Sequence, residues 1–122
     1  MIEPIADPPA GTLAFRAHGE LTRDDYRETL VPALREAVEA GSVRLLLVVA
    51  DDFEKMDFAA RIEDAKAELS FARRPGAWKR TALVTEVGWI RKAFHLFSWF
   101  APGELRVFGL AEEDEARAWV AA

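Results

Sequence analysis

Residues 43–50 read Val-Arg-Leu-Leu-Leu-Val-Val-Ala, and this stretch decides the fold. Apolar residues follow one another almost without alternation, which is typical of a β-strand that is buried on both faces of a parallel sheet. A strand of this kind needs helices on both sides of its sheet. The run is much shorter than the roughly 18 apolar residues that could span a membrane, so it is predicted to lie in a protein core.

Two elements are predicted on the N-terminal side of this strand. Residues 12–18 alternate as a second strand, with Leu13, Phe15 and Ala17 on one face, and residues 1–6 can pair back with it as an edge strand. A helix is predicted from residue 22 until Gly41 stops it, because apolar residues recur there every four positions. Pro32 removes one backbone hydrogen bond inside this helix, so we expect a bend near it.

The C-terminal side continues the alternation of helices and strands. Helices are predicted over residues 57–72, 88–101 and 112–121, and strands over residues 79–85 and 105–110, the latter at an edge of the sheet. This order predicts an α/β fold, with a four- to five-stranded mixed and mostly parallel sheet covered by about four helices. We expect residues 1–122 to form one domain.

The chain resembles the SpoIIAA-like family, small bacterial domains that share the fold of the STAS anti-sigma-factor antagonists. The residues that carry the resemblance run nearly from end to end: Gly19 to Tyr26, Leu30-Val31-Pro32-Ala33-Leu34, Asp51-Asp52-Phe53-Glu54, Glu63-Asp64-Ala65-Lys66, Trp89-Ile90-Arg91-Lys92-Ala93 and Pro102-Gly103-Glu104-Leu105-Arg106-Val107-Phe108. The resemblance implies regulatory protein binding, hydrophobic-ligand binding or membrane association.

One departure from that resemblance limits what it implies. Phosphoregulated STAS antagonists carry a phosphorylatable serine or threonine at the start of the helix after the central strand. The present sequence has no serine or threonine from Val43 to Leu69. A phosphoserine switch is therefore not expected.

Composition excludes several classes of protein. The chain of 122 residues is 51% hydrophobic and 30% charged, the balance of a globular domain. It has no cysteine, which excludes disulfides and thiol catalysis, and its net charge of −5 disfavours nucleic acid as a partner. The first residues, Met1-Ile2-Glu3-Pro4, lack the features of a secretion signal. We expect a cytoplasmic protein, with peripheral contact at the inner face of the membrane as an open possibility.

Polar residues follow the predicted strands where ligands collect in open α/β sheets. These residues are His18, Glu20, Asp51, Asp52, Glu54, Thr85 and Glu86. Two neighbouring carboxylates can divide acid and base roles or hold a hard cation, but no metal-binding or phosphate-binding motif accompanies them. The simpler interpretation is that Asp51 and Asp52 accept hydrogen bonds from backbone amides. We therefore predict no catalytic residue, no metal and no cofactor, and we leave an enzymatic role as a third alternative.

The predicted helix 88–101 has an unusual distribution of side chains. On a helical wheel, Ile90, Ala93, Phe94, Leu96, Phe97 and Phe100 form a broad apolar arc, and the other sector holds Arg91, Lys92, His95 and Ser98. Trp99 falls among these polar residues. Such a face suits a bilayer interface or a hydrophobic partner, although a core helix with scattered surface charge gives a similar pattern. Six basic residues and one acidic residue lie between Arg73 and Phe100, but a strand separates them into two groups.

The preferred hypothesis is a non-enzymatic domain that binds a small hydrophobic or lipid-like ligand between helices 57–72 and 88–101 and contacts the membrane peripherally. The predicted ligand-binding residues are Phe53, Phe58, Ile62, Phe94 and Phe97, and the predicted membrane or partner contacts are Arg91, Lys92, His95 and Trp99. The alternative is a regulatory protein-binding module that resembles an anti-sigma-factor antagonist without its phosphorylation site. The ligand, the partner and the oligomeric state, a dimer included, stay open.

Overall fold

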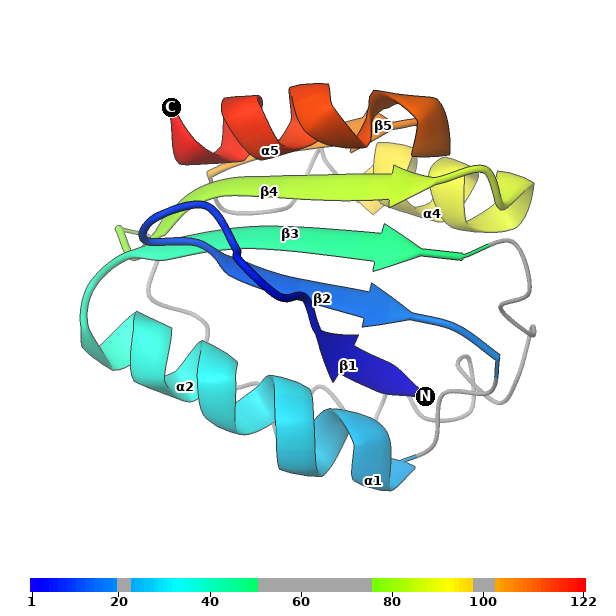
Figure 1. Cartoon of the computed structure of the whole chain (residues 1–122). Helices are drawn as coiled ribbons and strands as arrows, with labels where there is room; N and C mark the ends of the chain where they lie inside the picture. The colour runs from blue at the N-terminus through cyan, green and yellow to red at the C-terminus, as the bar shows by residue number, and fades with distance from the viewer. Residues whose placement is uncertain (20–22, 51–75, 98–102) are drawn as a thin grey trace.

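A computed structural model describes residues 1–19, 23–50, 76–97 and 103–122 (Figure 1). These residues form a five-stranded sheet in the order β1-β2-β3-β4-β5. The strands are β1 (Ile2–Pro4), β2 (Leu13–Ala17), β3 (Val43–Val49), β4 (Trp78–Thr85) and β5 (Glu104–Phe108). β1 runs antiparallel to β2, and every other neighbouring pair is parallel. The predicted mixed and mostly parallel α/β sheet is confirmed, including an edge strand at each end.

Strand β3 lies at the centre of the sheet and is buried on both faces, as its sequence predicts. Leu46 and Val48 have no exposed surface and belong to the core on the side of α5 (Glu113–Ala121). Val43 and Leu45 point to the other face, where they pack with residues of α2 (Val31–Glu39). The alternation of side chains along a strand explains how one apolar run serves two cores.

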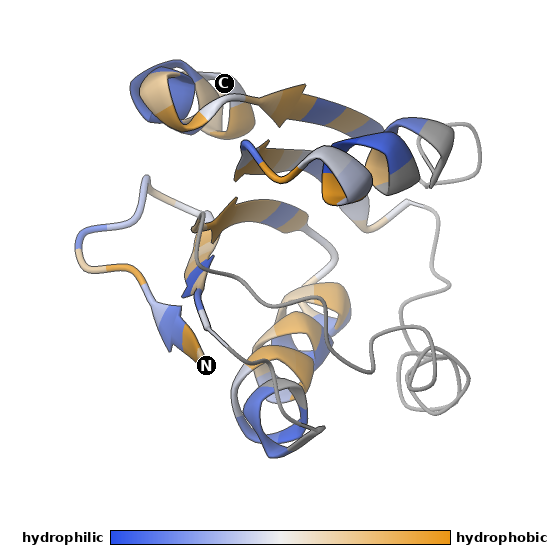
Figure 2. Ribbon diagram, turned by 90° about the vertical axis from the view of Figure 1, so that its right-hand side faces the viewer, coloured by the Kyte–Doolittle hydropathy of each residue, from blue (hydrophilic) through white to orange (hydrophobic). Residues whose placement is uncertain are grey.

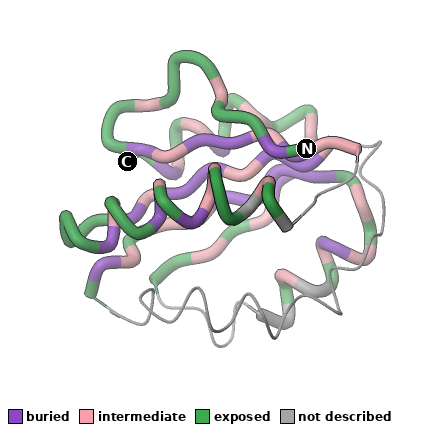
Figure 3. The backbone as a smooth tube through the Cα atoms, turned by 90° about the horizontal axis from the view of Figure 1, so that it is seen from below, coloured by how far each residue is buried: buried purple, intermediate pink, exposed green. Residues whose placement is uncertain are grey.

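Helix α2 covers one face of the sheet through Leu34 and Val38, which lie four residues apart and are both buried. Helix α5 covers the opposite face through Ala116 and Val120. Figure 3 shows the buried residues along the strands and on the side of α2 that faces them, and Figure 2 shows the polar residues on the outer sides of both helices. The layers are therefore helix, sheet and helix.

The segment before α2 differs in detail from a regular helix. It consists of a short α1 (Arg23–Asp25) and a π-helical turn over Tyr26–Leu30, after which α2 begins with Pro32 in its first turn. Proline has no N–H to donate, and the first turn is the one place in an α-helix where none is needed. The bend expected near Pro32 stays a prediction, and the segment before this residue contains a π turn in place of a regular α-helix.

Charged side chains attach α5 to the sheet at both of its ends. In its first turn, Glu113 Oε1 lies 3.2 Å from Arg16 Nη2 of β2. In its last turn, the carbonyls of Trp119 and Val120 accept hydrogen bonds from Arg80 and Arg44, at 2.7 and 2.8 Å. Negative charge at the start of a helix and positive charge at its end both favour the helix dipole.

Candidate functional site

The candidate site is built on helix α4 (Gly88–Phe97), which follows β4 after a two-residue connection. The predicted helix 88–101 is confirmed up to Phe97, and residues 98–101 lie outside the described ranges. The connection is held by Thr85, a residue with no exposed surface, whose Oγ1 accepts a hydrogen bond from the Val87 N–H at 3.1 Å. The turn fixes where the helix leaves the sheet.

The inner side of α4 rests on a small apolar core at the carboxyl ends of the strands. Ile90 is buried there against Ala17, Val49 and Leu83, each from a different parallel strand. Trp89, Phe94, Val87 and Val107 pack against the same cluster and are half-buried. In Figure 2 the helix lies beside the sheet on the face that also carries α2. The described aromatic residues of α4 thus contribute to packing on the sheet.

Arg91 fastens α4 to two strands at once. Its Nη1 donates to the carbonyl of Thr85 at 2.8 Å and to the carbonyl of Phe108 at 3.3 Å, and the side chain is half-buried. These carbonyls end β4 and β5, where the sheet ladder offers no further donors. The helical wheel placed Arg91 on the polar face of the helix, and the structure turns its guanidinium towards the sheet.

Lys92 and His95 lie on the exposed side of α4, in agreement with the polar sector of the wheel. No acidic residue occurs from Gly88 to Phe97, while the whole chain carries a net charge of −5. The other basic group predicted from the sequence, represented by Lys79 and Arg80, is at the opposite end of β4. Arg80 lies five positions before the end of β4 at Thr85, so roughly 17 Å of strand lies between the two groups and they form two separate surfaces.

Several predicted site residues lie outside the described ranges. Phe94 is the one predicted ligand-binding residue whose side chain is described. Phe53, Phe58 and Ile62 lie in the segment 51–75, outside the described ranges, as does the predicted helix 57–72. Phe97 lies in α4, but its side chain is not described. Trp99, Glu20, Asp51, Asp52 and Glu54 are also outside the described ranges.

The polar groups that are described at the carboxyl ends of the strands serve local contacts. His18 Nε2 lies 3.5 Å from Glu3 Oε2 on the neighbouring strand β1. Glu86 Oε2 accepts a hydrogen bond from the Leu110 N–H at 3.3 Å. His18 follows β2 and Glu86 follows β4, and the width of β3 holds these strands roughly 10 Å apart. In the parts of the chain that the structure describes, no three His, Asp or Glu side chains could hold a metal ion together.

Sequence reasoning missed two contributors to the site, Val87 and the Phe108 carbonyl. Val87 packs on the core beneath α4, and the apolar residue directly before Gly88 was a signal that could have found it. No sequence pattern could point to the carbonyl of Phe108, because every residue type has the same backbone carbonyl. Its role depends on β5 lying beside β4, which only the folded chain shows.

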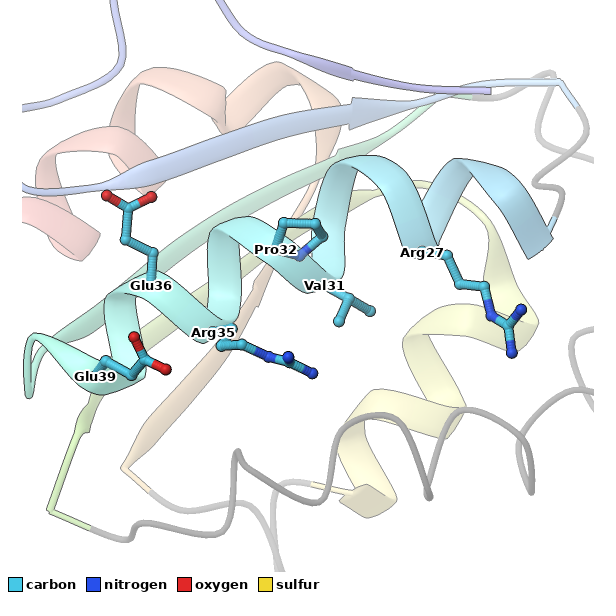
Figure 4. A pocket seen from close by; sticks show the side chains of 6 residues that line it. All are labelled: Arg27, Val31, Pro32, Arg35, Glu36 and Glu39. Atoms are coloured by element: carbon cyan, nitrogen blue, oxygen red, sulfur yellow. The ribbon is translucent and has the colours of Figure 1, made fainter.

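An open hollow of about 360 Å³ lies elsewhere, along α2 and the π turn before it (Figure 4). It is lined by Arg27, Val31, Pro32, Arg35, Glu36 and Glu39. Two cations and two anions share this lining, which favours neither sign of ligand charge. The hollow includes none of the residues predicted from the sequence. Within the described ranges, no helix has both the length and the apolar character needed to cross a membrane.

Comparison with known proteins identifies the family. A family model described as SpoIIAA-like matches residues 12–121. The crystal structure of an uncharacterized protein from the DUF3478 family with a SpoIIAA-like fold, from Shewanella loihica PV-4, is similar to this chain with a TM-score of 0.64 and 27% sequence identity. The match covers 98% of this chain and 93% of that chain. No curated protein matches. The strand order, the covering helices and the matched residues together show that the chain belongs to the SpoIIAA-like family.

Proposed function

We propose that this protein is a non-enzymatic binding module that associates with anionic lipid surfaces through the outer side of α4. The observation that carries the proposal is the division of the described side chains of α4. Ile90, Trp89 and Phe94 pack on the sheet, Arg91 is fixed by two strand carbonyls, and Lys92 and His95 remain exposed on a helix without acidic residues.

Arg91 acts in this proposal as a positioning residue. Its hydrogen bonds hold α4 to the ends of β4 and β5, so that the exposed side of the helix keeps one orientation relative to the sheet. Because α4 is already held in one orientation, Lys92 and His95 can contact a flat surface without a further loss of conformational entropy on binding. Lys92 and His95 then make the contact that Arg91 orients.

Electrostatic attraction supplies part of the binding free energy. A basic residue close to an anionic membrane contributes about 1 kcal/mol, and the contribution falls with salt. One helix with few cations therefore binds weakly unless apolar surface also enters the interface. The sequence continues with Trp99, which the helical wheel places beside Lys92 and His95, and we propose that its indole supplies that surface.

The proposed ligand class is a small hydrophobic or lipid-like molecule, as the sequence suggested. Phe94 is the one proposed ligand contact whose side chain lies in the described ranges, where it is half-buried against the core beneath α4. A non-enzymatic role is favoured because the described polar groups lie apart. His18 contacts Glu3, and Glu86 accepts a hydrogen bond from the Leu110 amide. His18 follows β2 and Glu86 follows β4, and strand β3 lies between them. Acid and base catalysis needs such groups within reach of one substrate atom.

Flotation of the purified protein with vesicles tests the proposal. Wild-type protein is expected to float with vesicles that contain anionic lipid and to stay in the soluble fraction with neutral vesicles. Lys92→Glu replaces a cation by an anion on the contact surface, and we expect it to lower the partition coefficient about 5- to 30-fold. If wild-type protein stays in the soluble fraction with both vesicle types, the proposal is wrong.

Lys79→Glu is the matched control for this experiment. It makes the same change in net charge at an exposed lysine, but at the opposite end of β4, where Lys79 Nζ contacts the carbonyl of Gly76. Its partition should equal that of the wild type within about twofold. Equal losses in both variants would mean that net charge alone, and not the surface of α4, determines binding.

A second candidate function is regulatory protein binding, and membership of the SpoIIAA-like family favours it. The same exposed side of α4 would then contact an acidic surface of a protein partner. Capture of the protein from its native host distinguishes the two functions. A stoichiometric protein partner that survives detergent and is lost with Lys92→Glu would support this function over lipid binding.

A further inference from the structure

The two edges of the sheet differ in how well they are protected. β1 forms one edge and is short, with three residues that end at Pro4, which has no N–H to offer. β5 forms the other edge with five residues, no proline and an uninterrupted register against β4 from Glu104 to Phe108. In the part of the chain that the structure describes, no strand pairs with its outer side. An unprotected edge offers free backbone donors and acceptors to another strand.

The face of β5 towards α5 is covered only in part. Helix α5 packs over β3 and β4 and reaches Phe108 at the end of β5, while Glu104 and Arg106 on the same face are exposed. On the opposite face, Leu105 and Val107 are half-buried, and Val107 packs on the core beneath α4. β5 therefore presents two charged side chains on one face and an apolar side on the other.

The order of charges along β5 allows two antiparallel copies of this strand to pair with opposite charges facing each other. We propose that β5 pairs with the β5 strand of a second copy of this chain, antiparallel and with the two-fold axis at Leu105. Glu104 then lies opposite the partner's Arg106, and Arg106 lies opposite Glu104 of the partner subunit. Opposite charges directly across two strands stabilise the pair by roughly 0.2–1 kcal/mol each. A register centred on Arg106 would instead place two guanidinium groups opposite each other.

Two aromatic rings hold the guanidinium of Arg106 in place. Its guanidinium carbon lies 5.0 Å from the centre of the Phe108 ring and 5.4 Å from that of Trp119. Within the described residues, no ion pair engages Arg106, while Glu104 contacts Arg80 at 3.2 Å and keeps 65% of its side chain exposed. Stacking on rings orders a guanidinium, so less conformational entropy is lost when a carboxylate binds its edge.

Cysteine cross-linking tests the pairing and its register, because the chain has no cysteine of its own. Leu105→Cys places two thiols across the two-fold axis, within the roughly 4–7 Å between Cα atoms that a disulfide needs. Mild oxidation is expected to convert this variant to a covalent dimer. Val107→Cys on the same face is the control, because its two copies are four strand positions apart, about 13 Å. Equal cross-linking of both variants, or none in Leu105→Cys, would overturn the proposal.

Charge reversal tests the same pairing in solution. Wild-type protein should have twice the mass of one chain by light scattering, whereas Arg106→Glu and Glu104→Arg alone should be monomeric because each sets like charges opposite each other. An equimolar mixture of these two variants restores both opposite-charge pairs and should form a heterodimer. Circular dichroism verifies that each variant is folded. A monomeric wild type, dimeric single variants, or a mixture that stays monomeric would each contradict the proposed interface, and none of these outcomes depends on lipid binding by α4.

Discussion

The guanidinium of Arg91 donates a hydrogen bond to the backbone carbonyl of Thr85 at 2.8 Å, across the junction between β4 and α4. The same nitrogen reaches the carbonyl of Phe108, at the end of the neighbouring strand β5. One side chain thus fixes a helix to two parallel strands at the end of the sheet where ligands collect in open α/β folds. The contact links the stability of the fold to the orientation of the proposed binding surface.

Replacement of Arg91 by alanine should destabilise the protein. The carbonyls of Thr85 and Phe108 lose a charged donor, and a hydrogen bond of this kind contributes about 1.5–3 kcal/mol when it is buried. Because Arg91 is only half-buried, we expect a loss of about 1–2 kcal/mol in the free energy of unfolding, measured by urea denaturation. Lys92→Ala, at the exposed neighbouring position, should change it by less than about 0.5 kcal/mol. Equal effects of the two substitutions would show that the Arg91 contacts do not stabilise the fold.

Gly103→Ala should be costly for two separate reasons. Gly103 has a φ of 76°, and an added Cβ would lie 2.6 Å from the carbonyl oxygen of Trp78. The left-handed conformation alone costs an alanine about 1–2 kcal/mol, and contact with a rigid backbone atom adds to that.

Gly41→Ala separates the two costs of Gly103→Ala. Gly41 has a similar φ of 84°, but a Cβ there would meet nothing within 4 Å. We expect a loss of about 1 kcal/mol for Gly41→Ala and clearly more for Gly103→Ala, measured by thermal or urea unfolding. If Gly103→Ala is as mild as Gly41→Ala, the chain before β5 does not approach Trp78 as closely as described.

Leu83→Ala should weaken the core beneath α4. Leu83 has no exposed surface and packs with Ile90, so its truncation leaves a cavity and costs about 2–5 kcal/mol. Leu110→Ala removes the same atoms from a half-buried position beside the other core and should cost less. Urea denaturation of both variants measures the difference, and a larger loss for Leu110→Ala would contradict the described packing.

Arg44→Met should destabilise the end of α5. Arg44 Nη1 donates to the Val120 carbonyl at 2.8 Å, in the last turn, where helix carbonyls have no partner within the helix. Methionine keeps the apolar part of the side chain but removes the donor and the charge that favours the helix dipole. We expect a loss of about 1–2 kcal/mol together with faster amide hydrogen exchange near Val120. Unchanged exchange there would show that the arginine does not hold the helix end.

Much of the fold could be predicted from residues whose environment follows from local pattern. The unbroken apolar run of β3 indicated burial on both faces, and the alternation of Leu13, Phe15 and Ala17 indicated the residues of β2 that share the face carrying α2 and α4. These patterns work because side chains on a strand alternate between faces whatever the rest of the chain does. The parallel sheet followed from helices that alternate with strands.

The site was less predictable because it depends on groups far apart in sequence. A helical wheel describes one helix by itself, so it placed Arg91 with Lys92 on the polar side. The two carbonyls that draw Arg91 inward belong to strands that meet only after folding. In the same way, Pro32 predicted a bend from its missing N–H, but no local pattern pointed to the π turn over Tyr26–Leu30. Contacts between distant backbone groups leave no pattern in the sequence.

Site-directed spin labelling tests the contact between α4 and an anionic surface most directly. His95→Cys introduces a single labelling site on the exposed side of α4 and retains Lys92, and Lys79→Cys provides a control label at the far end of β4. With anionic vesicles, the label at position 95 should gain accessibility to oxygen and lose accessibility to a water-soluble relaxation agent, while the label at position 79 should not change. If position 95 stays as accessible to the water-soluble agent with anionic vesicles as it is without them, α4 does not bind the membrane.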